Sequence, residues 1–180
     1  MKSKKKNIAI IFGGTGHEHE VSVRGADFIL ENIDRSVYEP FLVYITRLGG
    51  WQLCERGSNA YDAMLGTAKA VPTFPALIKG HSGLRVGRKI KKIYAAIPIL
   101  HGDGGEDGGV QSTLKIAGIR CAGEGSEVSA LCLDKAYTKI IANHVGVPTV
   151  PFILRHELSP SNPSLPPLWP RRRRWDTPFS

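Results

Sequence analysis

The segment from His101 to Gln111, HGDGGEDGGVQ, contains the residue types best suited to chemistry in this chain. Hard divalent cations favour oxygen ligands, so His101, Asp103 and Glu106 could form the site of a metal-dependent hydrolase. Alternatively, Glu106 and Asp107 precede a helical pattern, where capping and the helix dipole favour carboxylates. His101 follows the apolar run IYAAIPIL, which favours a functional role for it. The residue types alone leave a metal site and a ligand-facing turn both open.

A second cluster, FGGTGHEHE over residues 12–20, also follows an apolar run. Its glycines are typical of a phosphate loop, but it lacks the Gly-Lys-Ser/Thr ending of a Walker motif and does not complete Gly-x-Gly-x-x-Gly. The alternating His and Glu residues could bind a metal, although adjacent ligands rarely all point inward. A solvated helix start, with Glu18 and Glu20 at the positive end of the helix dipole, explains them better.

The elements around these clusters alternate between strands and helices. Apolar runs and turn residues predict strands over 7–14, 92–100, 119–123 and 147–154, and a pair of strands within 38–53 around a Gly49-Gly50 turn. Helices are predicted over 17–33, with Val21, Gly25, Phe28, Ile29 and Ile33 at helical spacing, over 110–118, and as two short helices with a break near Asp134. Residues 55–90 give no clear pattern. The sequence therefore predicts an α/β fold, a parallel sheet with helices on both faces, and ligands at the carboxyl ends of its strands.

Composition excludes several function classes. The net charge is +8, but four lysines in residues 2–6 and four arginines at 171–174 account for all of it, leaving 16 basic and 16 acidic residues. A nucleic-acid-binding module usually carries a basic stripe on its folded surface rather than charge at its two ends, so we expect no nucleic-acid partner. No run is long enough to span a membrane and no signal peptide is visible, so we expect no membrane association and a cytoplasmic protein.

Three blocks together resemble the amino-terminal part of the D-alanine–D-alanine ligases, a family of the ATP-grasp superfamily. They are IFGGTGHEHEVSVRGA, PILHGDGGEDGGVQSTLKIAGI and GSEVSALCLDKAYTKIIANHVGVPTVPFILR. The patterns LHG-x-x-GEDG-x-x-Q and SALC-x-DK-x-x-TK are highly specific, and the resemblance covers residues 7–157. It implies a Rossmann-like pre-ATP-grasp domain over residues 1–122 and the first elements of an ATP-grasp domain over 123–158.

The resemblance also implies an activity and its residues. The family joins two D-alanines for peptidoglycan synthesis, with ATP and Mg²⁺ or Mn²⁺ as cofactors. Glu18 would hold the ammonium of the first D-alanine, His101 would lie near that substrate and the acyl phosphate, and Lys135 would approach the ATP phosphates. The substrate-binding turn would be formed by Gly104, Gly105, Glu106, Asp107 and Gly108. The resemblance further implies a homodimer and leaves the second substrate open among D-alanine, D-lactate and D-serine.

From Ser159 the chain is rich in proline and arginine, and we expect residues 159–180 to be a disordered tail. A full ligase is much longer than this chain, so by the resemblance most nucleotide- and metal-binding residues are missing. We therefore expect little or no ligase activity from these 180 residues alone. The arginine-rich ending suggests a frameshift near residues 159–170. A non-catalytic binding module, with a basic tail that contacts anionic surfaces, is an alternative function.

Overall fold

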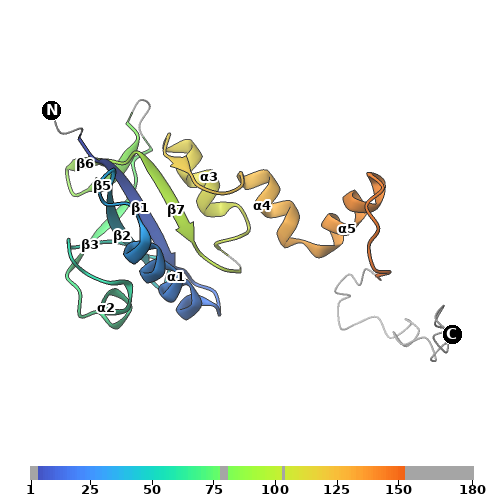
Figure 1. Ribbon diagram of the computed structural model, residues 1–180, viewed down its shortest axis with the longest axis horizontal. Coiled ribbons are helices and arrows are strands. Elements are labelled where there is room, and N and C mark those ends of the chain that lie inside the picture. The colour runs from blue at the N-terminus through green and yellow to red at the C-terminus, as the bar shows by residue number, and fades with distance from the viewer. Residues whose placement is uncertain (1–3, 78–80, 103, 153–180) are drawn as a thin grey trace, which may run out of the picture.

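The computed structural model describes residues 4–77, 81–102 and 104–152. Within these ranges the chain forms an eight-stranded sheet with helices on both faces, and a helical arm that leads away from the sheet (Figure 1). No helix in the described ranges is long and apolar enough to cross a membrane. The predicted tail over 159–180 lies outside the described residues, as does Asp103.

Four strands carry the predicted parallel pattern: β1 (Lys6–Gly13), β2 (Tyr38–Ile45), β7 (Ala95–Ile99) and β8 (Arg120–Cys121). β1 pairs in parallel with β2 and β7, and β7 pairs in parallel with β8. α1 (His19–Asn32) connects β1 to β2, and α3 (Gly109–Ile116) connects β7 to β8. The predicted parallel arrangement is confirmed, and both glycine clusters lie at its carboxyl edge, where ligands bind in such sheets.

Beyond β2 the sheet is antiparallel. β3 (Trp51–Cys54) pairs with β2 as the Gly49-Gly50 turn predicts. The next elements lie within 55–92, where the sequence shows no clear pattern: α2 (Ala60–Leu65), β4 (Ala70–Pro75), β5 (Gly83–Val86) and β6 (Lys89–Lys92). The strand order is β6-β5-β4-β3-β2-β1-β7-β8, so the sheet is mixed rather than wholly parallel. These strands are short, and they contain Pro in β4, Gly in β5 and Lys in β6, which are depleted in strands and weaken the sequence signal.

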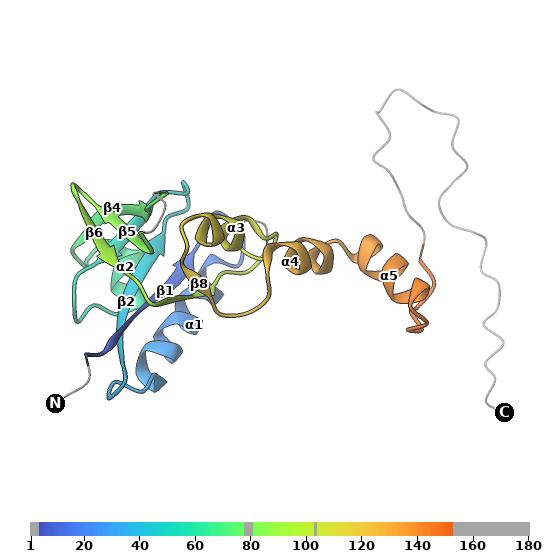
Figure 2. The same ribbon diagram turned by 90° about the horizontal axis from the view of Figure 1, so that it is seen from above.

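The sheet divides the core into two layers, and successive residues of β1 point into opposite ones. One cluster joins the sheet to α3 and includes Ala9, Ile11, Val110, Leu114 and Ala117. The other joins the sheet to α1 and α2 and includes Ile10, Phe12, Val23, Ala26 and Ala60. Figure 2 shows α1 and α3 on opposite sides of β1. Because side chains alternate along a strand, β1 is the apolar centre of both layers.

α1 turns only part of the predicted apolar face to the sheet: Ile29 packs against the core and Gly25 lies against Ile99. Its buried residues are His19, Ser22, Val23 and Ala26. Val21 and Phe28, which have the predicted helical spacing, are 51% and 65% exposed. The buried face is therefore partly polar, because its two polar side chains find hydrogen-bond partners in the strand ends.

α3 ends where the sequence predicts. Gly118 adopts the left-handed conformation at φ +67°. Its N–H donates to the carbonyl of Lys115 at 3.1 Å, and the N–H of Ile119 donates to the carbonyl of Leu114 at 2.9 Å. This pair of bonds is the Schellman motif, which satisfies the last carbonyls of a helix and favours glycine at this position.

The helical arm consists of α4 (Ser126–Leu133) and α5 (Lys135–His144). The predicted break at Asp134 is confirmed, since its carboxylate accepts from the N–H groups of Ala136 at 2.9 Å and Tyr137 at 3.1 Å. The predicted strand over 147–154 is wrong for residues 147–152, the part of it that the structure describes. Residues 147–152 form no strand, and 153–154 lie outside the described ranges. A strand needs a neighbour, and the arm leads away from the sheet (Figure 1).

Two contacts join α4 to α3. Lys115 Nζ donates to Glu127 Oε1 at 2.7 Å. Gly108, at φ +88°, precedes α3 and approaches the first residue of α4 so closely that a Cβ would lie 2.4 Å from the carbonyl oxygen of Ser126. The Lys115–Glu127 contact is exposed to solvent, whereas the Gly108–Ser126 contact leaves no room for a side chain at position 108.

The Lys115–Glu127 contact predicts a low carboxyl pKa. The hydrogen bond from Lys115 is the main cause that lowers the pKa of Glu127 to about 2, helped by backbone and Ser126 hydrogen bonds. Because the folded pKa lies below the ordinary glutamate value of 4.5, the stabilisation from this contact is fully present above that pH and is lost as pH falls towards 2. A carboxyl ¹³C titration by NMR should show this, and Lys115→Met should raise the pKa of Glu127. Lys89→Met, remote from this contact, is the control, and a Glu127 pKa near 4.5 in the unchanged chain would contradict the contact.

The Gly108 contact predicts an unequal cost for two alanine substitutions. A Cβ on Gly102 would have no atom within 4 Å. Gly102→Ala should therefore lower the free energy of unfolding by about 1–2 kcal/mol, the cost of the left-handed conformation for alanine. Gly108→Ala should lower it by the same amount and by roughly 1–3 kcal/mol more, because the new methyl group overlaps the backbone of Ser126. Urea unfolding followed by circular dichroism measures both. Equal losses would show that α4 does not lie against Gly108.

Candidate functional site

Two carboxylates of the 101–111 segment, those of Glu106 and Asp107, bind its own backbone. Glu106 Oε2 accepts from the N–H of Gly102 at 3.0 Å. Asp107 accepts from the N–H of Gly104 at 3.0 Å and from that of Gly109 at 2.9 Å. These bonds hold the turn and the start of α3, which is the structural role that the helical pattern indicates for the two acids.

No metal cluster is formed by the part of the chain that the structure describes: no group of three or more His, Cys, Asp and Glu residues there could hold an ion. The hydrolase set of His101, Asp103 and Glu106 is not placed as a whole, because Asp103 lies outside the described residues. Glu106 already binds the N–H of Gly102. Nothing in the described geometry favours the hydrolase.

His101 follows the end of β7 and is about one-third exposed, with its side chain at 34%. Its Nδ1 lies 3.7 Å from Glu106 Oε1, a spacing that becomes an ion pair when the imidazole is protonated. Glu106 therefore holds the turn with one oxygen and faces His101 with the other. This arrangement orients the imidazole at the carboxyl edge of the sheet, at the mouth of a cavity.

That cavity has a volume of about 430 Å³ and brings the second and third sequence blocks together. The end of β7 and the turn provide one wall, and α4 with the start of α5 provides the other. It is lined by Pro98, Ile99, Leu100, His101, Gly105, Glu106, Gln111, Ala122, Gly123, Glu124, Val128, Ser129, Cys132, Leu133 and Lys135. Four predicted site residues, His101, Gly105, Glu106 and Lys135, thus share one cavity. The other turn residues lie outside its lining.

Lys135 is the first residue of α5, and its Nζ donates to the carbonyl of Cys132 at 3.0 Å. The side chain therefore folds back over the end of α4 and remains exposed. The first N–H groups of α5 are already bound by the Asp134 carboxylate, so the Lys135 ammonium is the group in this corner of the cavity that could bind an anionic ligand such as a phosphate group.

Glu18 occupies the N-cap position of α1 but makes no side-chain cap hydrogen bond. Its neighbour Glu20 lies 3.6 Å from Arg47, so the two acids have different surroundings. Glu18 is exposed and does not line the 430 Å³ cavity. Its turn nevertheless touches the cavity's turn, since a Cβ on Gly104 would lie 3.2 Å from Thr15 Oγ1. The first and second sequence blocks are therefore adjacent.

Gln111 is a cavity residue to which the sequence reasoning gave no role. Its Nε2 donates to the carbonyl of Gly105 at 3.0 Å, which fixes the amide orientation. Its Oε1 is buried and accepts no hydrogen bond from the described residues. The motif LHG-x-x-GEDG-x-x-Q contains this glutamine, so the signal was present in the sequence. Ser129 and Cys132, by contrast, reach the cavity only through the docking of α4.

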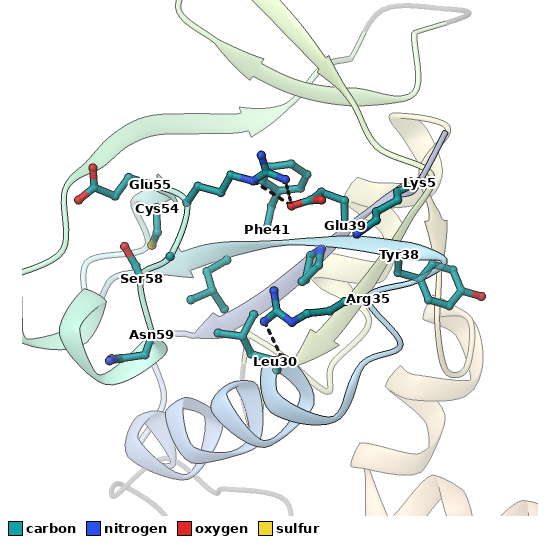
Figure 3. A pocket seen from close by; sticks show the side chains of 14 residues that line it. Lys5, Leu30, Arg35, Tyr38, Glu39, Phe41, Cys54, Glu55, Ser58 and Asn59 are labelled. Carbon is teal, nitrogen blue, oxygen red and sulfur yellow. Dashed lines mark hydrogen bonds and ion pairs between the residues drawn. The ribbon is translucent and has the colours of Figure 1, made fainter. Parts of the chain in front are cut away.

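A second cavity, of about 400 Å³, lies at the opposite edge of the sheet, beside the amino-terminal half of β2. Arg56 Nε donates to Glu39 Oε1 at 2.9 Å in this cavity. Arg35, also in its lining, donates to the Leu30 carbonyl (Figure 3). The hydrogen bond from Arg56 lowers the pKa of Glu39. None of the predicted site residues lines this cavity.

The chain is similar to known proteins over most of its length. Residues 7–124 match the family described as D-ala D-ala ligase N-terminus. The D-alanine–D-alanine ligase of Sodalis glossinidius is 34% identical over 160 residues, which cover 84% of this chain and 44% of that protein. The vancomycin/teicoplanin A-type resistance protein VanA of Enterococcus faecium is 36% identical over 151 residues, or 81% of this chain and 42% of VanA.

Solved structures give the same result. The D-alanine–D-alanine ligase from Coxiella burnetii superimposes with a TM-score of 0.76 and 27% identity over 89% of this chain and 46% of that one. The VanG D-Ala:D-Ser ligase from Enterococcus faecalis superimposes with a TM-score of 0.73 and 30% identity, over 79% of this chain and 43% of that one. The chain spans less than half the length of these relatives. The match over residues 7–124 shows that the chain belongs to the D-ala D-ala ligase N-terminus family.

Proposed function

We propose that this chain supplies the D-alanine-binding wall of an ATP-dependent ligase that joins D-alanine to a second substrate. The observation that carries the proposal is the meeting of the three sequence blocks: His101, Glu106 and Lys135 line one cavity, and the Glu18 turn lies against its loop. By the family resemblance, the product serves peptidoglycan synthesis in the cytoplasm, and the enzyme is a homodimer. The second substrate stays open among D-alanine, D-lactate and D-serine.

Glu18 is the residue that we assign to the ammonium of the first D-alanine. An exposed carboxylate without a cap hydrogen bond is available to a cation, whereas Glu20 already faces Arg47. A charge-assisted hydrogen bond of this kind contributes about 1.5–3 kcal/mol. Glu18 would therefore bind the ammonium group of the substrate. The carboxylate of the substrate would then extend towards the His101 cavity.

His101 and Lys135 are assigned to the anionic end of the same substrate. His101 can donate a hydrogen bond to a carboxylate or to the acyl phosphate formed from it. Lys135 would offset negative charge on the opposite wall of the cavity. The two groups come from different elements, so a ligand between them also holds α5 against the loop.

The cofactors fit the described residues unequally. The Lys135 ammonium has the charge to bind a polyphosphate, and bound ATP would supply the phosphoryl group that activates the D-alanine carboxylate. The described residues contain no set of ligands for Mg²⁺ or Mn²⁺.

The Glu18 assignment predicts stereoselective binding of D-alanine. Adding D-alanine to ¹⁵N-labelled chain should shift amide resonances in residues 13–22 and 101–109, and L-alanine should shift them less. Glu18→Gln should weaken binding about tenfold or more, because it removes one charged partner of the ammonium. Glu20→Gln, in the same turn but paired with Arg47, is the matched control and should leave the affinity within about twofold. Equal effects of the two variants would contradict the assignment of Glu18.

The 180 residues alone should release ADP at no more than the background rate when given ATP, D-alanine and Mg²⁺. Phosphoryl transfer depends on positioned charges around the phosphates, and the described residues provide one cation and no metal site. A coupled assay of ADP measures this. D-alanine-dependent turnover would contradict this prediction and show that the 180 residues are sufficient for catalysis.

A further inference from the structure

Two polar side chains in the first turns of α1 are fully buried: His19 is 1% exposed and Ser22 is 0% exposed. Burying such groups is unfavourable unless hydrogen-bond partners replace the lost water. Residues three apart lie on the same face of a helix. The partners of both side chains lie at the carboxyl edge of the sheet, so they cluster beside the candidate site.

The Ser22 hydroxyl joins the ends of two strands. Its Oγ accepts from the N–H of Gly13 at 2.8 Å and donates its proton to the carbonyl of Ile99. A hydroxyl has a single proton, so this pair of bonds fixes its direction. Ile99 is the last residue of β7 and precedes His101 by two positions. Ser22 thus ties α1 to the strand that carries His101.

The His19 ring joins the turn after β1 to β2. Its Nδ1 lies 2.6 Å from the carbonyl oxygen of Gly14, and its Nε2 lies 3.0 Å from the hydroxyl of Tyr44. A carbonyl only accepts, so Nδ1 must carry a proton. The Tyr44 hydroxyl can both donate and accept, so it can bond to Nε2 whether or not Nε2 carries a proton. The contacts therefore place a proton on Nδ1 of His19.

We propose that Ser22 and His19 are positioning residues for the D-alanine site. The inference rests on the proposed function, because it concerns the spacing between Glu18 and His101. Glu18 directly precedes His19, and His101 follows the carbonyl that Ser22 binds. Through the two side chains, the first turn of α1 is held against the ends of β1, β2 and β7. The two assigned residues keep a fixed spacing, although neither Ser22 nor His19 is exposed to a ligand.

The His19 contacts are tested by long-range ¹H–¹⁵N correlation spectra of the histidine rings in the full chain. We expect a proton on Nδ1 of His19. A ring with its proton on Nε2 alone would overturn this half of the proposal, because Nδ1 could then not donate to the carbonyl of Gly14. Tyr44→Phe removes only the hydroxyl partner and should speed exchange of the Val21 and Ser22 amides, which donate to the carbonyl of Glu18, about tenfold. Unchanged exchange would contradict the role of His19.

The Ser22 contacts are tested with a neighbouring control. Val23 is 2% exposed and packs in the same layer, but its hydrocarbon side chain forms no bridge. Ser22→Ala should speed exchange of the Gly105 and Glu106 amides, which donate to the carbonyl of Gly102, about tenfold relative to the unchanged chain. Val23→Ala, compared at equal global stability, should change these rates by no more than about twofold. D-alanine affinity should fall about tenfold in Ser22→Ala only.

The outcomes separate this inference from the proposed function. Equal exchange rates in Ser22→Ala and Val23→Ala would show a merely structural role for Ser22 and overturn the inference, whether or not D-alanine binds. If exchange differs as expected but the unchanged chain does not bind D-alanine, the proposed function fails and the positioning of the His101 turn by Ser22 stands. If Ser22→Ala does not fold, the Tyr44→Phe and tautomer measurements decide the His19 bridge on their own.

Discussion

The site depends on backbone contacts that leave no space for side chains around the His101 turn. A Cβ on Gly105 would lie 2.4 Å from Leu100 Cβ, and one on Gly108 would lie 2.4 Å from the carbonyl oxygen of Ser126. The first contact folds the turn back over the end of β7, and the second places α4 against it. The carboxylates of Glu106 and Asp107 stabilise this compact backbone by accepting hydrogen bonds from its N–H groups. Glycines and carboxylates occur together here because close packing and hydrogen bonding are required of the same few residues.

The buried polar face of α1 follows from the topology of the sheet. The carboxyl ends of parallel strands leave backbone N–H and carbonyl groups unpaired where the chain turns away. Ser22 binds two of these groups and His19 binds a third, so the helix that follows β1 satisfies the edge on which the site is built. An apolar face would pack on the sheet but would leave those groups without partners. The helix that begins directly after Glu18 therefore also stabilises the ends of three strands at this edge.

Sequence patterns predicted the elements with strong local signals. The apolar runs of β1 and β7, the Gly118 helix end and the Asp134 break were all identifiable, because each depends on residues close together in the chain. The antiparallel strands within 55–92 were not, since short strands acquire stability from their neighbours. The strand expected at 147–154 was wrong because an apolar run alone does not provide a partner strand. Cavity residues contributed by α4 depend on tertiary docking, and the buried role of Ser22 depends on strands far away in sequence.

The central claim is that three separate sequence blocks meet around one turn. Nuclear Overhauser effects in the 180-residue chain test it most directly, since they report protons within a few ångströms of each other. The structure predicts cross-peaks between Gly104 and Thr15, and between Gly108 and the α-proton of Ser126, because the corresponding Cβ positions lie 3.2 Å and 3.0 Å from atoms of those residues. The Gly105–Leu100 contact serves as an internal reference. A spectrum that contains the reference cross-peak but neither of the other two would contradict the account.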